Sequence, residues 1–307
     1  MKSQFQRMSR AVRLIGVAGV SAVLGAYAQT AKADDYAYYL SYYYASSTQQ
    51  GGGTYGRLDL DTGLSSQIAS FTPPCCNGSN GYTGLGVTNG ELYSTTLYGA
   101  GTHSSLLAVP DAGHPQGTTS VVGTDTGRDI ADFGSSSSGL YAVGQIGNLL
   151  SINPTTGTST VIGATGFVPG NFDFSGMSAD GKTLYLTLSN TLYSLNTSTG
   201  VATEIGSTGD FEFGAMVYEG GKLYGAGFNN AQVGAIPPFS NIIGEINPLT
   251  GAVSDVVTVA GDLPSADFIV GLADTAGLST SVPEPTDVGL LGLGIAGLVW
   301  RRKRVSR

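Results

Sequence analysis

The chain has 307 residues, of which 47 are Gly and 12% are charged, and its formal net charge is −8. This length allows two average domains or one larger all-β domain. Residues 34–287 contain four Lys and Arg against 22 Asp and Glu, a net charge of −18. Nucleic-acid affinity comes largely from basic side chains that displace counterions, so no nucleic-acid partner is expected. Neutral polymers, cations and cationic surfaces stay open as ligands, but we favour the simpler interpretation of a solvated acidic surface that keeps an exported protein soluble.

The N-terminal segment has the three parts of a secretory signal peptide. Four basic residues precede an apolar stretch at 14–28, and Ala31 and Ala33 are small residues placed for cleavage before Asp34. The alternative, a membrane anchor, is disfavoured because 15 apolar residues fall short of the roughly 20 that span a bilayer. We predict a signal peptide at 1–33 and a mature chain that begins at Asp34.

The mature chain opens with six tyrosines in positions 36–44. Side chains alternate along a strand, so Tyr36, Tyr38, Leu40, Tyr42 and Tyr44 would share one face, and Tyr39 and Tyr43 the other. Such tyrosines could stack on sugar rings or form an interface. We favour a buried first strand whose tyrosines pack between neighbouring sheets.

The two cysteines, Cys75 and Cys76, are adjacent. Neighbouring Cα atoms lie about 3.8 Å apart, below the usual disulfide range of roughly 4.4–6.8 Å, so a bridge between them would be strained. The alternatives are a vicinal disulfide, an intermolecular bridge and reduced thiols, and we rank the vicinal disulfide first because export leads to an oxidising compartment.

Three carboxylates, Asp125, Asp129 and Asp132, lie close together in the sequence. A calcium-binding EF-hand would need Glu eleven residues after its first Asp, where Ser136 stands, so we favour a solvated loop. Neither His103 nor His114 has a recognisable catalytic context. The sequence has no phosphate loop, dinucleotide fingerprint or zinc motif, and we predict no catalytic residues, no metal and no cofactor.

A repeat runs through the body. Leu-Tyr pairs begin at 92, 140, 184 and 223, with spacings of 48, 44 and 39 residues. Segments that end in Thr-Gly recur at 59–63, 153–157, 196–200 and 247–251, and Asp59 and Asp61 resemble turn residues of this repeat. Periods of 40 to 50 residues are typical of propeller blades or solenoid units.

The repeat at 172–205 resolves into four expected strands. These are 172–178, 183–188, 191–195 and 201–205, with Asp180-Gly181 as a two-residue type I′ turn. Four short antiparallel strands per unit indicate a β-propeller blade. We therefore predict an all-β propeller of about five or six four-stranded blades at 34–277, closed by a strand near 268–272. A β-solenoid or β-sandwich is the alternative. The repeats resemble divergent blades of exported bacterial propellers, which implies a fold and no function.

The chain ends in an extended, an apolar and a basic part. Pro283 and Pro285 fix φ and lack N–H groups, so Pro283-Glu284-Pro285 should be extended within a linker at 278–287. The apolar run 288–300 has 13 residues, about 20 Å as a helix against a hydrocarbon core of about 30 Å. We predict a short transmembrane helix followed by a cytoplasmic basic tail at 301–307. Its stop-transfer residues are Arg301, Arg302, Lys303 and Arg304.

These three parts, in this order, resemble the PEP-CTERM sorting signal of exported bacterial proteins over residues 282–307. Segments of this kind are also called ice-binding protein C-terminal domains, a name that says nothing about ice here. The resemblance implies processing by exosortase, a membrane-embedded protease-transpeptidase of bacteria that make extracellular polysaccharide. Asp287 departs from the pattern because it places a charge where the apolar run usually begins. An ordinary tail anchor is the alternative.

Two functions remain as hypotheses. The first is a non-enzymatic binding or scaffolding protein that is exported through the inner membrane, transiently membrane-anchored, and then located at the cell surface or in the extracellular polysaccharide matrix. The second is a propeller enzyme, a hydrolase or lyase acting on polysaccharide. An enzyme should bring several ionisable side chains to the tunnel mouth, whereas a mouth lined by Gly, Ser and Thr favours the first hypothesis.

Overall fold

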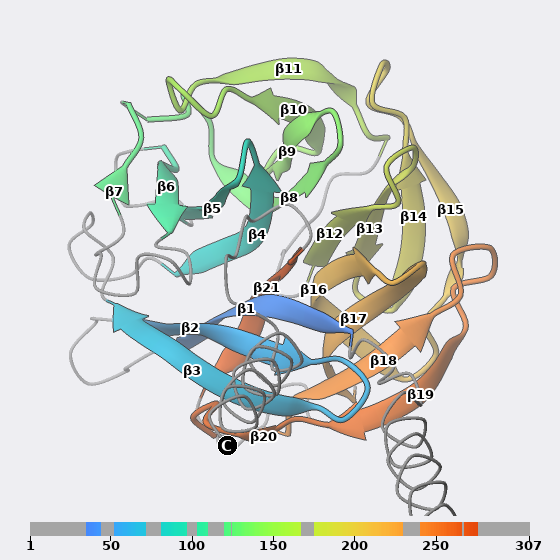
Figure 1. The fold of residues 1–307 in the computed structure, drawn as a ribbon. Coiled ribbons are helices and arrows are strands. Elements are labelled where there is room, and N and C mark those ends of the chain that lie inside the picture. Colours follow the sequence, from blue (N-terminus) through green and yellow to red (C-terminus); the bar gives the residue numbers. More distant parts are fainter. Residues whose placement is uncertain are drawn as a thin grey trace, which may run out of the picture.

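The computed structural model describes residues 35–43, 52–71, 81–96, 103–109, 120–123, 125–166, 175–229, 240–265 and 267–275. Within these ranges the strands form five sheets arranged as blades around a central axis (Figure 1). In the described part of the chain the protein is all-β, a β-propeller with five four-stranded blades, one of which carries an additional short edge strand.

Strands of one blade are consecutive in sequence in four of these five sheets. The second blade contains β4 (Tyr82–Thr88), β5 (Glu91–Thr96), β6 (Leu106–Val109) and β7 (Ser120–Val121). The third contains β8 (Ile130–Ser136), β9 (Gly139–Gly144), β10 (Asn148–Ile152) and β11 (Ser159–Ala164). The fourth contains β12 (Ser175–Ala179), β13 (Leu184–Leu188), β14 (Thr191–Leu195) and β15 (Ala202–Ser207). The fifth contains β16 (Phe211–Glu219), β17 (Lys222–Asn229), β18 (Ile242–Ile246) and β19 (Val253–Thr258).

The first blade joins the two ends of the body. It contains β1 (Tyr36–Tyr43), β2 (Gly52–Asp59), β3 (Leu64–Phe71), β20 (Ala260–Gly261) and β21 (Phe268–Asp274). Strand β21 pairs antiparallel with β1, with Leu272 opposite Tyr39, so the expected closing strand is confirmed. Strand β20 also pairs parallel with β3. The closed ring excludes the solenoid and sandwich alternatives for the described body.

The turn predicted at Asp180-Gly181 is wrong in type. Ala179 pairs with Leu184, so four residues form the loop, and of the two predicted turn residues Gly181 is the one with positive φ, +86°. The Asp180 carboxylate accepts the backbone N–H groups of Lys182 and Thr183 at 2.9 and 2.7 Å. This side-chain turn replaces the two-residue turn that the Asp-Gly pair suggested.

The tyrosine-rich strand is buried on both faces, as expected. Tyr38 and Tyr39 each have 0% exposure, and they belong to two different hydrophobic clusters that lie on opposite sides of the first blade. The Tyr38 and Tyr55 rings stack at 5.5 Å between centroids. Burial excludes the alternative in which these two side chains stack on sugar rings.

The loops that end in Thr-Gly share one geometry. Asp59 Oδ1 accepts the N–H groups of Asp61 and Thr62 at 3.0 and 2.9 Å, which confirms Asp59 and Asp61 as turn residues. The same turn recurs with Asn: Asn153 accepts from Thr155 and Thr156, Asn196 from Ser198 and Thr199, and Asn247 from Leu249. In each loop one Asp or Asn side chain therefore stabilises the turn that connects the third and fourth strands of the blade.

Glycines allow the innermost strands to approach one another around the axis. A Cβ atom on Gly134 of β8 would lie 2.7 Å from the Met177 carbonyl oxygen of β12. A Cβ on Gly176 of β12 would lie 2.7 Å from the Ala215 backbone of β16. Since real Cβ contacts this short essentially do not occur, the close packing of neighbouring blades requires glycine at these positions.

Several predicted features lie outside the described residues. These are the signal peptide with Ala31, Ala33 and Asp34, the cysteines Cys75 and Cys76, and the C-terminal segment with Pro283, Glu284, Pro285, Arg301, Arg302, Lys303 and Arg304. Within the part of the chain that the structure describes, no helix has the length and apolarity needed to cross a membrane.

Candidate functional site: the mouth of the central tunnel

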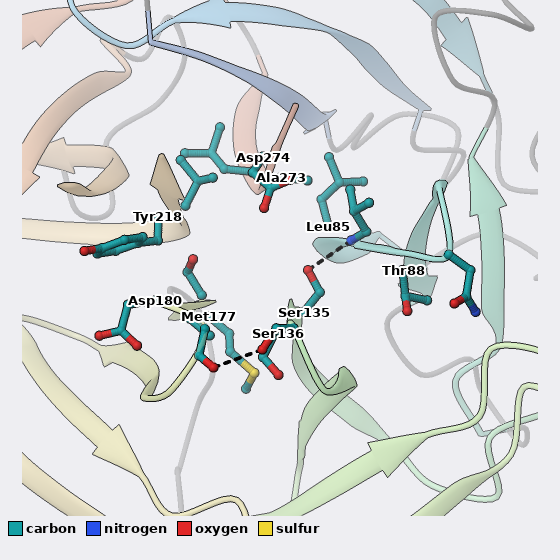
Figure 2. A pocket seen from close by; sticks show the side chains of 17 residues that line it. Leu85, Thr88, Ser135, Ser136, Met177, Asp180, Tyr218, Ala273 and Asp274 are labelled. Carbon is teal, nitrogen blue, oxygen red and sulfur yellow. Dashed lines mark hydrogen bonds between the residues drawn. The ribbon is translucent and has the colours of Figure 1, made fainter. Parts of the chain in front are cut away.

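A cavity of about 410 Å³ opens where the inner strands of the five blades end (Figure 2). The strands β4, β8, β12, β16 and β21 contribute to its wall, together with residues of the turns that follow β4, β8 and β12. Its described lining is Leu85, Val87, Thr88, Asn89, Ser135, Ser136, Ser137, Met177, Ser178, Ala179, Asp180, Gly181, Val217, Tyr218, Leu272, Ala273 and Asp274. Every blade therefore supplies part of this cavity, which is called the tunnel mouth, or the mouth, below.

The lining combines apolar strand residues with polar ends. Leu85, Met177 and Leu272 are buried side chains of the inner strands. Serines at the end of β8 and in the β8–β9 turn lie at the rim and connect blades. Ser135 Oγ accepts the Val87 N–H at 3.0 Å, and the Ser137 hydroxyl donates to the Gly181 carbonyl at 2.9 Å. Hydrogen bonds between adjacent blades thus fix the shape of the rim.

Asp180 places a fixed negative charge at the rim. Its Oδ1 accepts the two backbone N–H groups of its own loop, and its Oδ2 accepts the Tyr185 hydroxyl at 3.1 Å. Partial burial raises the pKa of the carboxyl, but the hydrogen bonds from Thr183, Lys182 and Tyr185 and the Lys182 charge outweigh it, so the pKa is lowered. Asp180 is therefore ionised at neutral pH.

A second acidic region lies where the ends of β16 and β21 meet Asp35, the residue before β1. Asp274 ends β21 and lines the mouth. Glu219 ends β16, and its Oε2 accepts the Thr275 N–H at 3.4 Å. Burial raises the pKa of Glu219, and the charges of Asp274 and Asp35 raise it further. Carboxylates from three segments far apart in the sequence thus influence one another here.

The repeated Leu-Tyr pairs have a structural role. Each lies on the second strand of a blade, and each tyrosine hydroxyl bonds to a polar group of the body. The partners are Glu91 for Tyr93 at 2.6 Å, Ser138 for Tyr141 at 3.0 Å, Asp180 for Tyr185 at 3.1 Å and Asp35 for Tyr224 at 3.1 Å. Burial raises the pKa of Tyr93 and of Tyr224, with further increases from the carboxylates they contact. The Tyr185 hydroxyl therefore orients Asp180 at the mouth, and the Tyr224 hydroxyl orients Asp35 near it.

The three aspartates that the sequence grouped together do not form one site. Asp132 is fully buried on β8, whereas Asp125 is exposed and its Oδ2 lies 3.5 Å from His103 Nδ1. Burial raises the pKa of Asp132 to about 8, against the opposing effects of the Phe133 N–H and the Ser175 hydroxyl. Among the described residues, no group of three or more His, Cys, Asp and Glu side chains is arranged to hold a metal ion.

Sequence reasoning missed the residues that line the mouth. Asp180 was assigned to a turn, and Met177, Tyr218 and Asp274 were not singled out. What these residues share is a place at the end of the innermost strand of a blade or just beyond it. Aligning the repeats on their first strands rather than on the Leu-Tyr pairs would have grouped them.

The C-terminal segment matches the family model described as the PEP-CTERM protein-sorting motif over residues 281–304. This motif indicates an exported protein that is associated with the membrane and processed by exosortase. The chain is thus a β-propeller protein that carries a PEP-CTERM sorting signal. No curated protein matches the sequence.

Solved structures with a similar arrangement share little sequence. A chain of the nidogen/laminin complex is 12% identical, with 78% of this chain and 99% of that chain covered and a TM-score of 0.44. A protein of unknown function from Bacteroides caccae is 12% identical, covering 73% and 82%, with a TM-score of 0.42. Glutaminyl cyclase from Myxococcus xanthus is 10% identical, covering 72% and 95%, with a TM-score of 0.39. These likenesses say nothing about function, and the fold assignment rests on the strand pairing.

Proposed function

We propose that this protein is a non-enzymatic binding or scaffolding protein of the cell surface or the extracellular polysaccharide matrix, and that the tunnel mouth is its binding site. In this proposal residues 1–33 direct export, residues 34–277 form the delivered body, and the linker, the apolar run 288–300 and the basic tail hold the protein in the membrane until exosortase acts. An extracellular polysaccharide is the proposed partner.

The observation that carries the proposal is the chemistry of the mouth. Its described lining contains Thr, Asn and Ser residues, two carboxylates and no Lys, Arg or His. Acid–base catalysis generally needs groups whose pKa values are matched to proton transfer near the working pH. The pKa of Asp180 is lowered instead, which suits a permanent charge that holds a ligand better than a proton donor.

The delivery route is tested by the intact mass of the protein in membrane and medium fractions of its native host. We expect a mature N-terminus at Asp34 and a C-terminus near Pro285 in the medium fraction. An intact C-terminus through Arg307, found in membranes alone, would instead establish a permanent tail anchor.

The binding role is tested with the full-length chain, purified in detergent, on an array of immobilised polysaccharides and oligosaccharides. We expect retention of at least one class of glycan, with the glycan recovered unchanged. Failure to retain any glycan would contradict the proposal. The variant Ser136→Arg, which places a bulky charge at the half-buried rim of the mouth, should reduce retention, provided that its circular dichroism spectrum matches that of the unmodified chain.

An enzyme acting on polysaccharide, a hydrolase or lyase, is the second candidate because of one observation. Burial and the neighbouring charges of Asp274 and Asp35 raise the pKa of Glu219 beside the mouth. Glycoside hydrolysis uses a pair of carboxyl groups, one of which has a raised pKa and serves as the general acid. This candidate would be established over the first if the protein produced new reducing or unsaturated ends from a polysaccharide that it retains, and if Glu219→Gln abolished their formation.

A further inference from the structure

The tunnel mouth carries negative charge from two different blades. Asp180 lies in the β12–β13 loop of the fourth blade and Asp274 at the end of β21 in the first, and both line the cavity (Figure 2). The nearest basic residue in sequence, Lys182, is close enough for its charge to lower the pKa of Asp180, but it lines a separate groove of the fourth blade and not the mouth. Because low-dielectric walls concentrate the field of charges in a cleft, the mouth should attract cations.

The charge of Asp180 is held in place before any ligand arrives. Three hydrogen bonds fix the carboxylate, and two of them come from backbone N–H groups of a loop that the carboxylate itself stabilises. A charged group that is already oriented loses little conformational freedom when it pairs with a ligand. Asp180 is therefore suited to contact a cationic group directly.

The rest of the mouth suits a ligand that has both apolar and hydroxyl-bearing faces. Half-buried Ala179 and Tyr218 offer a methyl group and an aromatic ring, above the nearly fully buried side chains of Met177, Leu85 and Leu272. Ser136, Asn89 and their neighbours supply hydrogen-bonding groups at the rim. The cavity volume of about 410 Å³ lies within the range of roughly 300–1,000 Å³ typical of small-molecule sites.

We infer that the mouth binds an amino sugar with a free, protonated amine, such as a residue of a de-acetylated amino-sugar polymer. The sugar ring presents C–H groups to the methyl group and aromatic ring of the mouth and hydroxyls to the Ser and Asn rim, and the ammonium lies near Asp180 and Asp274. This inference rests on the proposed binding function and adds a substrate class to it.

The test compares two tetrasaccharides that differ in charge. The probes are β-1,4-linked glucosamine tetramer and β-1,4-linked glucose tetramer, in which hydroxyls replace the amines. Each is titrated calorimetrically into the full-length chain in detergent at about pH 6, where the amines are protonated. We expect the glucosamine tetramer to bind at least about fivefold more tightly, and the difference to shrink at high salt because partly exposed charge pairs are screened.

Three Asp→Asn variants locate the charge effect. Asp180→Asn keeps the Oδ1 acceptor that closes the loop, as Asn153 and Asn196 do in the loops that end in Thr-Gly, so the fold should be preserved. We expect Asp180→Asn and Asp274→Asn each to weaken glucosamine binding by about three- to fivefold and to leave glucose binding unchanged. Asp255→Asn makes the same charge change on exposed β19 and should alter neither.

The outcomes separate this inference from the function beneath it. If the two tetramers bind equally, or if the chain retains other glycans on the array and neither tetramer, the binding function stands and the amino-sugar assignment is wrong. If glucosamine binding falls equally in all three variants, the affinity depends on the total negative charge of the protein, and the assignment of the binding site to the mouth is wrong. If no glycan of any class is retained, the proposed function itself fails.

Discussion

The carboxyl group of Asp132 couples the stability of the propeller to pH. It is fully buried, and its Oδ1 accepts the Phe133 N–H at 2.7 Å. Burial raises its pKa to about 8 in the folded chain, whereas an Asp in an unfolded chain titrates near about 3.9. The folded state thus keeps its proton to higher pH, so this residue's contribution to stability is lost as pH rises from about 4 to about 8.

Asp132→Asn should remove this pH dependence. The amide still accepts the Phe133 N–H and carries no charge, so the free energy of unfolding at about pH 8 should rise by about 2–5 kcal/mol. This increase in the free energy of unfolding should become smaller toward about pH 5. Urea denaturation of both proteins at about pH 8 and about pH 5 measures it. Asp255→Asn on exposed β19 is the control for the change of net charge. If the free energy of unfolding changes with pH in the same way for Asp132→Asn and the unmodified chain, burial does not raise the pKa of Asp132.

The loops that end in Thr-Gly are the elements through which the outer part of one blade contacts the next blade. Gly157 has φ of +73°, and a Cβ there would lie 2.2 Å from the Val122 carbonyl oxygen in the second blade. Gly200 and Gly251 have φ of +82° and +76° and would meet Gly163 and Gly206 in the same way. The repeated glycine therefore serves both the turn and the contact between outer strands.

Gly157→Ala should destabilise the protein more than a glycine that has the same backbone conformation and open surroundings. Gly209 has φ of +69° with no atom near its missing Cβ, so Gly209→Ala should cost about 1–2 kcal/mol from the backbone alone. Gly157→Ala should cost about 1–3 kcal/mol more because the neighbouring blade must move. Chemical denaturation of both variants measures the difference, and equal losses would mean that the loop does not hold the blades together.

At the scale of the whole molecule, the C-terminal part of the body closes the ring at both edges of the first blade. Strand β21 covers the inner edge of β1, and β20 pairs with β3 at the outer edge. Buried Ser41 donates to the Asp267 carboxylate at 2.7 Å, and Asn241 donates to the Asp267 carbonyl at 2.8 Å. The residue that precedes β21 thus links the first and fifth blades.

A chain that ends after residue 265 should therefore lose the closed ring. Without β21, β1 would present an unpaired inner edge, which favours association between chains. We expect this truncation to form soluble aggregates and to become sensitive to protease, whereas a chain that ends after residue 275 should stay folded and resistant. Size-exclusion chromatography and limited proteolysis of the pair measure this, and a monomeric, resistant shorter chain would show that closure is not required.

The sequence by itself determined the repeat, the strands within the best copy, the burial of the tyrosine-rich strand and the sorting signal. These features are local: period, alternation and turn residues act within about 45 residues, and the sorting motif consists of consecutive positions. The tertiary structure decided that there are five described blades, that β20 extends the first, and that Asp180 and Asp274 lie at one cavity. Each blade gives one strand end to the mouth, so its lining depends on how the blades pack and close, and no contiguous stretch of sequence contains it.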